Sequence, residues 1–555
     1  GSTLEYRNIL AAYNRFNEWS NGTALGAGVP DNVIIENATL DLTNSGQSDF
    51  VNFTVGSALS LLTNGNLTID ANESLSLGGD FSNAGGSLDL NSESDDYSSL
   101  IVDGTSTGNV IYRRHVNSLA STNTVTGDND LISAPVTNAS QTFGVFSEAN
   151  ANIPSGTVGG GPTTFYLFGP FDNTNATHPY TLYSDANDGD AITAGVGYRT
   201  ASTDTSTFTF VGDVETGTVP VGINVGSAFQ WNLIGNPYPS YINSGTFLIE
   251  NAEFLDDNAV GIYGYDGLAN ANGGWTIINF NTISAVKNIA PGQGFLVAAA
   301  GTSTLNFTPT MREVLGTDDF ILGRTSDNKF ISLKIENNST SYHTDFYFND
   351  NSTRALDPGY DAAVFDVNSA SLFIYSHLVE NNEGRSMAIQ SFNRTDLTDI
   401  TIPLGVKANQ GHQITFSIDN STLPNTVEVY LEDNVTNTFT LLTNSDYAFT
   451  PNTDISGTGR FFLRFADSAL STVDDTFETL SIYTNDTDKT IVIAGQLLEA
   501  TTAKVYDLQG RLVAEAQLET SKTSQSIDAR TLSTGVYVIQ LSSVSKRKSQ
   551  KLIIR

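Results

Sequence analysis

Short runs in which apolar and polar residues alternate dominate the chain. Residues 51–61 have the sequence VNFTVGSALSL and residues 65–77 have the sequence GNLTIDANESLSL. Side chains two apart lie on the same face of a strand, so each run predicts a half-buried strand that ends at Asn, Gly, Ser or Asp. Repetition at roughly 10–20 residues favours a small β-solenoid or hairpin stack over residues 31–108. An ordinary sandwich is the alternative.

The pattern changes after residue 108, where strands become longer and loops larger. Segments such as WNLIGNPYPSYI (231–242) and IAPGQGFLVAAA (289–300) predict buried strands, and Trp231 and Trp275 are expected to anchor a core. Residues 325–466 carry about ten short alternating strands, the spacing of a sandwich. Residues 1–30 instead place apolar and aromatic residues as in a short helix or an aromatic cap.

The sequence therefore predicts an all-β protein of tandem β-sandwich domains with an N-terminal β-solenoid-like segment. The predicted divisions are an N-terminal helix or cap (1–30), a solenoid-like or hairpin-stack segment (31–108), a β-sandwich-like domain (109–310), a linker (311–324), a β-sandwich domain (325–466), a second linker (467–478) and a last unit (479–555).

Charge narrows the range of partners. The 555 residues include 60 acidic and 26 basic side chains, a formal net charge of −34, and no cysteine. Such a surface repels nucleic acid and anionic membranes, and the lack of cysteine excludes disulfides and a thiol nucleophile. No uninterrupted apolar window of about 18 residues predicts a transmembrane helix. The chain begins GSTLEYRN, without an initiator methionine, as expected of a processed form or of an expressed segment.

The C-terminal part differs in charge from the rest. From Val473 to Arg555 we count ten acidic and ten basic residues, so this stretch is neutral and everything before it carries the net charge. Within it, KVYDLQGRLV (504–513) predicts a tight hairpin, because aspartate and glycine suit its turn. A composition break of this kind indicates a separate module.

In order and spacing, the motifs of this module resemble the type A C-terminal sorting domain of Bacteroidota cargo proteins of the type IX secretion system. The residues that carry the resemblance are Lys504, Val505, Tyr506, Asp507, Gly510, Gly535, Val536, Tyr537, Lys551, Leu552, Ile553 and Ile554.

The resemblance implies a route and a set of partners. In that family the sorting domain is a small β-sandwich that carries its cargo through the outer-membrane translocon of a Gram-negative bacterium. Shuttle and sortase components then usually remove it, and the cargo is attached to surface polysaccharide or released. We expect the terminal strand around Leu552–Ile554 to dock by strand addition, with a simple edge strand as the alternative.

The sequence offers little for catalysis. None of the five histidines forms a close pair of the HExxH kind, which leaves zinc chemistry unsupported. The segment GTSTG (104–108) matches G-x-S-x-G around Ser106, but a strand pattern follows where a nucleophile elbow needs a helix, so we expect a turn residue. With 60 acidic residues, no carboxylate pair stands out as a glycosidase pair. We therefore expect no enzyme.

Calcium is the one ligand that the sequence favours, since it binds oxygen atoms on loops. The segment SDANDGD and the loop around Pro358–Gly359 supply the candidates, with solvated turn aspartates as the alternative. The candidate ligands are Asp185, Asn187, Asp188, Asp190, Asp357 and Asp361. Three aromatic residues, Tyr263, Tyr265 and Trp275, are expected in the core rather than on a carbohydrate platform. Ser468, in Asp467–Ala469, resembles an O-glycosylation signal.

Taken together, these patterns predict a secreted, structural or adhesin-like protein of the cell surface, such as a stalk or filament subunit. It would act by self-association or on surface polysaccharide. A carbohydrate-binding module array, or the non-catalytic C-terminal part of a polysaccharide-degrading enzyme, is the alternative.

Overall fold

The computed structural model describes most of the chain. The residues outside the description are 10, 16–17, 21–25, 43–50, 120–128, 205, 268–273, 284–287, 315, 317–328, 339, 366–370, 468–479, 486–487, 496, 498, 508–510, 544–546 and 555. The chain divides into two compact units, of which the second contains residues 465–555 together with 397–400 and 424–429. Strands make up 52% of the chain and helices 6%, which confirms the predicted all-β class.

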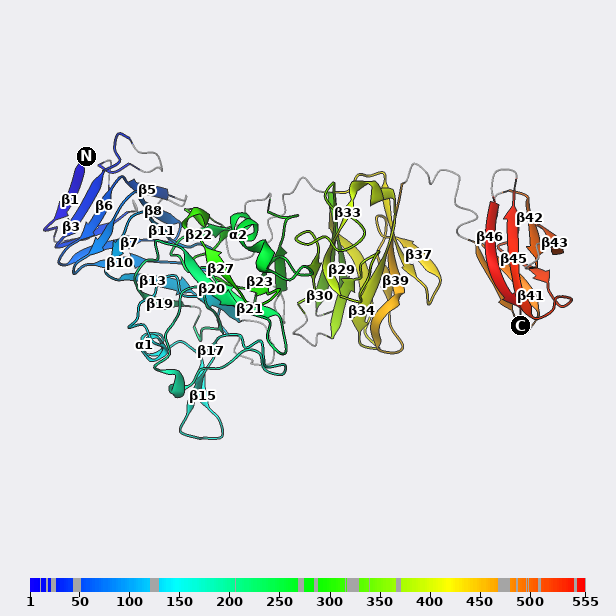
Figure 1. The fold of residues 1–555 in the computed structure, drawn as a ribbon, viewed down its shortest axis with the longest axis horizontal. Coiled ribbons are helices and arrows are strands. Elements are labelled where there is room, and N and C mark those ends of the chain that lie inside the picture. The colour runs from blue at the N-terminus through cyan, green and yellow to red at the C-terminus, as the bar shows by residue number, and fades with distance from the viewer. Residues whose placement is uncertain are drawn as a thin grey trace. The chain divides into compact units, whose positions relative to one another are not determined.

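The N-terminal part is a parallel β-solenoid whose coils contribute strands to three sheets (Figure 1). The first sheet contains β1 (Thr3–Arg7), β3 (Asn32–Glu36), β6 (Ala58–Leu61), β9 (Phe81–Asn83) and β12 (Ser106–Thr107). The second contains β2 (Tyr13–Asn14), β4 (Ala38–Asp41), β7 (Gly65–Ile69), β10 (Ser87–Leu90) and β13 (Val110–His115). The third contains β5 (Val51–Val55), β8 (Glu73–Leu77) and β11 (Ser99–Val102).

Each passage from the first sheet to the second turns through a left-handed residue. In successive coils this residue is Asn8, Asn37, Asn64, Gly85 and Gly108, with φ values of 55°, 47°, 53°, 132° and 85°. Asparagine and glycine tolerate this conformation better than other residues. The asparagines also stack: the Asn64 amide donates to Asn37 over 3.1 Å, and the Asn37 amide donates to Asn8 over 3.4 Å.

Leucine, isoleucine and valine from every coil point inward and form one apolar interior. At its N-terminal end, the indole of Trp19 is fully buried and donates to the Thr54 carbonyl on β5 over 3.1 Å. The guanidinium of Arg15 lies over the Phe53 ring, 4.4 Å from its centroid. Trp19 and Arg15 therefore close the end of the interior and occupy an exposed edge carbonyl.

The alternative of an N-terminal helix is wrong for the described residues. β1 and β2 pair in parallel with β3 and β4, so residues 3–14 are the first coil of the solenoid. Tyr6 points inward and Glu5 and Arg7 point outward, which is strand alternation. The spacing of the aromatic residues fits both a helix and a strand, and pairing with the next coil makes this segment a strand.

The middle region is built from small sheets and two short helices. Its elements are β14 (Asp130–Ser133), α1 (Phe143–Ala149), β15 (Ser155–Thr157), β16 (Thr164–Tyr166), β17 (Phe168–Gly169), η1 (Asp185–Asn187), β18 (Gly197–Thr200), β19 (Thr207–Gly212), β20 (Val219–Ile223), β21 (Trp231–Gly235), β22 (Tyr241–Asn243), α2 (Ser244–Asn251), η2 (Ala252–Phe254), β23 (Ile262–Asp266), β24 (Gly274–Ile278), β25 (Asn288–Ile289), β26 (Gly294–Ala298), β27 (Ser303–Phe307), η3 (Pro309–Met311) and β28 (Arg312–Glu313). Its largest sheet has the order β21-β26-β23-β24, and β19 continues the second sheet of the solenoid by pairing antiparallel with β13.

The third region is one long sheet whose two ends meet. Its elements are β29 (Lys329–Glu336), β30 (Ser341–Asn349), β31 (Ala362–Ala363), β32 (Leu372–Ser376), β33 (Met387–Asn393), η4 (Arg394–Thr398), β34 (Asp399–Ala408), β35 (Ile414–Ser421), β36 (Val427–Asp433), β37 (Thr438–Leu441), β38 (Tyr447–Phe449) and β39 (Ile455–Asp467). The hydroxyl of Tyr447, on β38, donates to Asp433 on β36 over 2.8 Å, and Arg460 binds Asp433 through two nitrogens. These contacts join strands near opposite ends of the sheet.

In its described residues, the C-terminal module has seven strands in two sheets around its own core. They are β40 (Ser481–Asn485), β41 (Thr490–Ala494), β42 (Thr501–Tyr506), β43 (Leu512–Leu518), β44 (Ser524–Asp528), β45 (Gly535–Ser542) and β46 (Arg547–Ile554). One sheet has the order β40-β41-β44 and the other β43-β42-β45-β46. The predicted KVYDLQGRLV hairpin is confirmed as β42–β43.

Two predicted boundaries need correction. The solenoid was placed at 31–108, but its strands extend from Thr3 to His115, because β13 is the last parallel strand. Met311–Glu313, assigned to a linker, belong to the middle region, since β28 pairs with β22. Most of the predicted 311–324 linker, and nearly all of 467–478, lie outside the described residues.

The left-handed residue between the first and second sheets gives a first testable prediction. Replacing Asn64 by alanine should lower the free energy of unfolding of the solenoid by about 1 kcal/mol, because alanine is strained at φ 53°. Asn64→Gly is the matched control: it loses the same side-chain hydrogen bond but tolerates the backbone conformation. Denaturant unfolding followed by tryptophan fluorescence measures both. Equal losses in the two variants would show that the side chain, and not the backbone, matters at this corner.

Candidate functional site

The acidic candidates of the segment SDANDGD stabilise their own loop. The side chain of Asn187 donates to Asp190 over 2.8 Å and accepts the Ser184 backbone N–H over 2.9 Å. Asp185 accepts the backbone N–H of Thr164, the first residue of β16, over 2.9 Å. Asp188 is exposed beside Gly144. Backbone N–H groups and an amide thus already hold three of these four side chains.

The second pair of candidates, Asp357 and Asp361, is held in a similar way. Asp357 accepts the Thr353 backbone N–H over 2.6 Å. Asp361 is buried and accepts the N–H groups of Asp357 and Ser391 over 2.8 and 2.7 Å. Burial raises the pKa of Asp361 to about 8, although these two N–H groups act in the opposite direction. In the described residues no three acidic or histidine side chains gather as metal ligands. Calcium binding stays a prediction.

Of the other candidates, Ser468 lies outside the described residues. Ser106 is half-buried on β12 rather than in a turn, and the left-handed Gly108 and strand β13 follow it. Tyr263 is fully buried, and Tyr265 and Trp275 pack against the same cluster. The three aromatic residues therefore serve a core, as the sequence indicated.

The predicted sorting residues lie on three neighbouring strands of one sheet. Lys504, Val505 and Tyr506 are on β42, and Gly535, Val536 and Tyr537 begin β45. Lys551, Leu552, Ile553 and Ile554 are on β46, with Leu552 and Ile554 buried. Asp507 binds both the backbone N–H and the guanidinium of Arg511, over 2.9 and 3.0 Å, which fixes the turn. Gly510 lies outside the described residues.

The solenoid and the middle region meet at one interface, which we call the first joint, and the middle and third regions meet at another, the second joint. Buried polar groups are found at both. At the first joint, Arg114 on β13 is completely buried. Its Nε donates to the Gly292 carbonyl over 3.2 Å, and its guanidinium lies 3.6 Å from the Asp130 carboxylate. The same group lies 4.9 Å from the centre of the Tyr97 ring and donates to the His115 carbonyl. Arg114 therefore ties three segments that are distant in the sequence.

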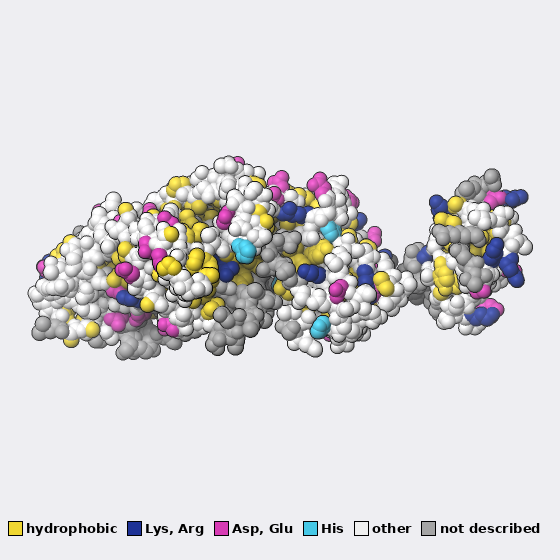
Figure 2. Space-filling model, turned by 90° about the horizontal axis from the view of Figure 1, so that it is seen from below, with side chains coloured by type: hydrophobic (Ala, Val, Ile, Leu, Met, Phe, Trp, Pro, Cys, Tyr) yellow, Lys and Arg dark blue, Asp and Glu magenta, His cyan; other side chains and the backbone are white. Residues whose placement is uncertain are grey.

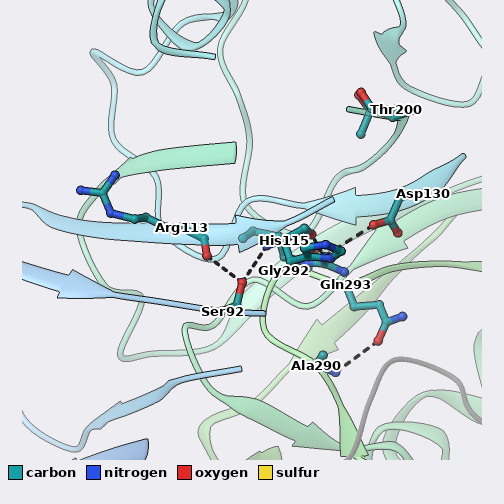
Figure 3. A network of polar contacts seen from close by, with 10 residues as sticks. Ser92, Arg113, His115, Asp130, Thr200, Ala290, Gly292 and Gln293 are labelled. Carbon is teal, nitrogen blue, oxygen red and sulfur yellow. Dashed lines mark hydrogen bonds and ion pairs between the residues drawn. The ribbon is translucent and has the colours of Figure 1, made fainter. Parts of the chain in front are cut away.

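The backbone around Arg114 is fixed from both sides (Figure 3). The Ser92 hydroxyl, from the coil below, donates to the Arg113 carbonyl over 2.7 Å and accepts the His115 N–H over 2.6 Å. On the other side, Gly292 has φ 62°, and a Cβ there would lie 2.8 Å from the Ser133 carbonyl. Only glycine fits this close approach.

The motifs WNLIGNPYPS and APGQGFLV meet at this joint. They form the paired strands β21 and β26 and the turns that flank them. The buried amide of Asn236 donates to the Ser240, Ile289 and Ala290 carbonyls over 2.8, 3.3 and 3.0 Å. One side chain thus satisfies backbone groups of both motifs, which explains why an asparagine precedes the two prolines.

The middle region also covers the last strand of the third solenoid sheet. The Leu100 N–H on β11 donates to the Pro239 carbonyl over 2.6 Å. Arg312 on β28 donates to the Val102 carbonyl over 2.7 Å and pairs with Asp103 at 2.9 Å. Tyr97 and Tyr241 pack edge to face with centroids 6.4 Å apart. The outer edge of β11 is therefore covered by the middle region.

At the second joint, aromatic side chains of the middle and third regions share one buried cluster. Phe365 packs against Trp231 and Trp275, with centroids 4.9 and 4.5 Å apart. The Tyr263 hydroxyl donates to the Ala363 carbonyl over 2.8 Å. The loop that contains Asp361 therefore lies directly on the middle region.

Asparagines complete this joint. The amides of Asn279 and Asn281 both donate to the Tyr360 carbonyl, over 2.9 and 2.6 Å, and the Phe280 N–H donates to Gly359 over 2.8 Å. Gly359 has φ 83°, and a Cβ there would clash with the Phe280 ring. Chemically, the joints offer backbone pairing and burial.

Sequence reasoning missed the joints, although one signal was present. In NVIYRRHV, strand alternation places Arg114 on the same face as the buried Val110 and Tyr112. An arginine in an inward phase predicts a buried partner, because an unpaired charge is expensive to bury. Nothing local indicated that Asp130 and Gly292 would be those partners.

Two family models match the chain. Residues 11–465 match a domain of unknown function (DUF8693), and residues 481–555 match a secretion system C-terminal sorting domain. The second match confirms the predicted cargo of the type IX secretion system, and export to the cell surface or the extracellular space. Among the described residues, no helix has the length and apolar character of a membrane span.

Similar solved structures are distant. A structure titled biofilm associated protein, BSP domain, is 8% identical, covers 61% of this chain and 96% of its own, and has a TM-score of 0.14. The FN1–FN3 domains of chicken CNTN1 are 8% identical, cover 43% of this chain and 92% of their own, and have a TM-score of 0.12. No curated protein matches the sequence.

The first joint yields a prediction for Arg114. Replacing it by methionine leaves Asp130 buried beside an apolar side chain, and should lower the free energy of unfolding by about 3 kcal/mol or more. The neighbouring Arg113 is the matched control, because its pair with Asp89 is on the surface and Arg113→Met should cost less than about 1 kcal/mol. The midpoint of urea unfolding measures both. Equal shifts would contradict a special role for the buried guanidinium.

The second joint yields a prediction for pH. The pKa of Asp361, about 8, lies above that of an unfolded aspartate, so the folded state holds a proton that the unfolded state releases. Stability should therefore fall as pH rises toward 8, by up to about 1.4 kcal/mol per pH unit.

Asp361→Asn keeps the shape of the protonated group and should lose this contribution. Burial also raises the pKa of Glu73 to about 8, but that group is common to both proteins. The test is the difference in unfolding free energy between variant and wild type from pH 5 to 9. Parallel curves would mean that Asp361 is ionised in the fold throughout.

Proposed function

Because the chain belongs to the family of the domain of unknown function DUF8693 and ends in a secretion-system sorting domain, we propose that its exported part is a structural, adhesin-like protein without enzymatic activity. It would form a rigid extension outside a Bacteroidota cell and attach that cell to a surface. The sorting domain supplies the route, and residues 1–465 would supply the working part.

The observation that carries this proposal is the continuity of the buried interior across the joints. One apolar cluster contains residues of the solenoid and of the middle region, and another contains residues of the middle and third regions. Domains within one chain are expected to move relative to one another unless the interface between them is large and hydrophobic. Arg114 and the Asn279–Asn281 segment add directional hydrogen bonds to both joints. Residues 1–465, which we call the body, therefore suit a stalk or a filament subunit.

The surface charge supports the same role. On the face drawn in Figure 2, acidic side chains are spread over the body, and basic ones are numerous on the sorting module. A strongly acidic body stays soluble and repels nucleic acid and anionic lipid. Its partners would be a divalent-rich matrix or further copies of the chain.

The test compares cells and purified protein. Cells that lack the chain should attach less to surfaces or to one another than the parent cells, and re-expression should restore attachment. The purified full chain should show no saturable binding to soluble polysaccharides below about 100 µM, because the aromatic side chains among the exposed large hydrophobic residues of the described chain, Phe439 and Tyr483, lie on different sheets.

Saturable, micromolar binding to one defined polysaccharide would replace the proposal by the carbohydrate-binding array. Turnover of that polysaccharide would replace it by an enzyme. Unchanged attachment of the deficient cells would also contradict it.

A further inference from the structure

The two flanks of the sorting module differ. At one flank, β46 and β40 belong to different sheets but cover each other's edges. The Thr484 hydroxyl on β40 donates to the Ile553 carbonyl on β46 over 3.0 Å, and the Gln550 amide on β46 donates to the Ile482 carbonyl on β40 over 2.8 Å. Leu552 and Ile554 are buried beneath them. This flank, which contains the terminal strand, is closed.

The opposite flank, along β43, is open. β43 is the outer strand of its sheet, and apart from pairing with β42 no backbone hydrogen bond to residues 512–518 occurs in the described part of the chain. Bridging to the other sheet begins only after the strand ends, where Gln525 binds the N–H and carbonyl of Glu519 over 2.7 and 2.8 Å. The strand itself keeps a bare edge.

Small side chains line much of the inner face along this flank, where Leu518 is the one large buried side chain of β43. On the inner face, Ala514 and Ala516 lie opposite the fully buried Val505 and Ala503. Both alanines pack on the core but are only half-buried, unlike Leu552 and Ile554 on the closed flank. On the outer face, side chains of β43 already have partners on β42: Glu515 lies near Lys504, and Gln517 accepts a hydrogen bond from Thr502. The incomplete part of the module is therefore an inner layer beside two small side chains.

We propose that β43 is the docking edge of the sorting domain and accepts a β-strand from a protein of the secretion machinery. The added strand would pair with the backbone of residues 512–518 and place large apolar side chains, two residues apart, beside Ala514 and Ala516. Backbone pairing supplies affinity, and the space beside the alanines supplies selectivity. A bare edge is a template for such pairing, which most proteins cover or charge.

The occupant follows from two observations. The module matches a secretion-system sorting domain, so a protein of that system must bind it. On the neighbouring edge strand, β44, Ser524, Ser526 and Asp528 are exposed, and the one large apolar side chain, Ile527, is already buried in the core. This inference rests on the export route and is independent of the adhesin-like role of the body. It replaces the expected strand addition at Leu552–Ile554, whose edge is occupied.

The first test fills the space beside the alanines. Ala514→Leu and Ala516→Leu in the full chain cover more of the core, and the module should melt at the same temperature or higher. Export to the cell surface and medium, measured by immunoblot against the amount retained in the cell, should fall at least about tenfold. Ser526→Leu on β44 is the matched control and should be exported within about twofold of wild type. Normal export of both alanine variants would overturn the proposal.

The second test uses the lack of cysteine in the chain, which makes one introduced thiol unique. Ala516→Cys is a minimal change, so it remains informative where a leucine variant fails to fold. During export in native cells, a thiol-to-amine crosslinker should join it to a secretion-machinery protein that mass spectrometry identifies, and should leave Ser526→Cys unjoined.

Three outcomes would contradict β43 as the docking edge: adducts from Ile553→Cys but not from Ala516→Cys, adducts only between two copies of this chain, and no adduct while export proceeds. If the wild-type chain itself is not exported, the export route fails and not this edge. Loss of cell attachment with normal export would concern the body alone.

Discussion

Backbone N–H and C=O groups at the edge of a sheet must be paired, covered or left to water, and this requirement governs the whole protein. A solenoid has an edge at each end of every sheet. At the N-terminal end, the indole N–H of Trp19 donates a hydrogen bond to the Thr54 carbonyl. At the other end, β19 extends one sheet, while Pro239 and Arg312 bind the last strand of another. The modules that follow the solenoid are therefore also its terminal cover.

This requirement explains why polar residues are concentrated where modules meet. Loops that cover an edge bring their own backbone groups into the interior, and these groups need partners in turn. Asn236, Asn279 and Asn281 supply donors at such places, and Arg114 supplies several at once. Each joint combines an apolar contact with a small number of directional bonds, so it fixes the relative position of the regions it connects.

Much of the architecture follows from local sequence. Strict alternation with polar corners predicted the solenoid, and the hairpin motif with its terminal strand predicted the sorting domain. What the sequence did not reveal depends on pairing between distant residues. The segment 3–14 is a strand because the next coil pairs with it, and Arg114 is buried because Asp130 and Gly292 arrive from elsewhere. The terminal strand looked like the free edge, and only the packing of β40 against it leaves β43 open.

The column of left-handed corners has a further consequence for how the chain can change its length. β3, β6, β9 and β12 begin at residues 32, 58, 81 and 106, so each coil takes roughly 25 residues. The intervals of 26, 23 and 25 residues show that the loops of a coil take up small differences in length while Asn37, Asn64 and Gly85 stay in line. An insertion of one whole coil would keep every corner in place and lift the N-terminal end by one strand spacing, about 4.8 Å. The length of the solenoid can therefore increase only in steps of one whole coil.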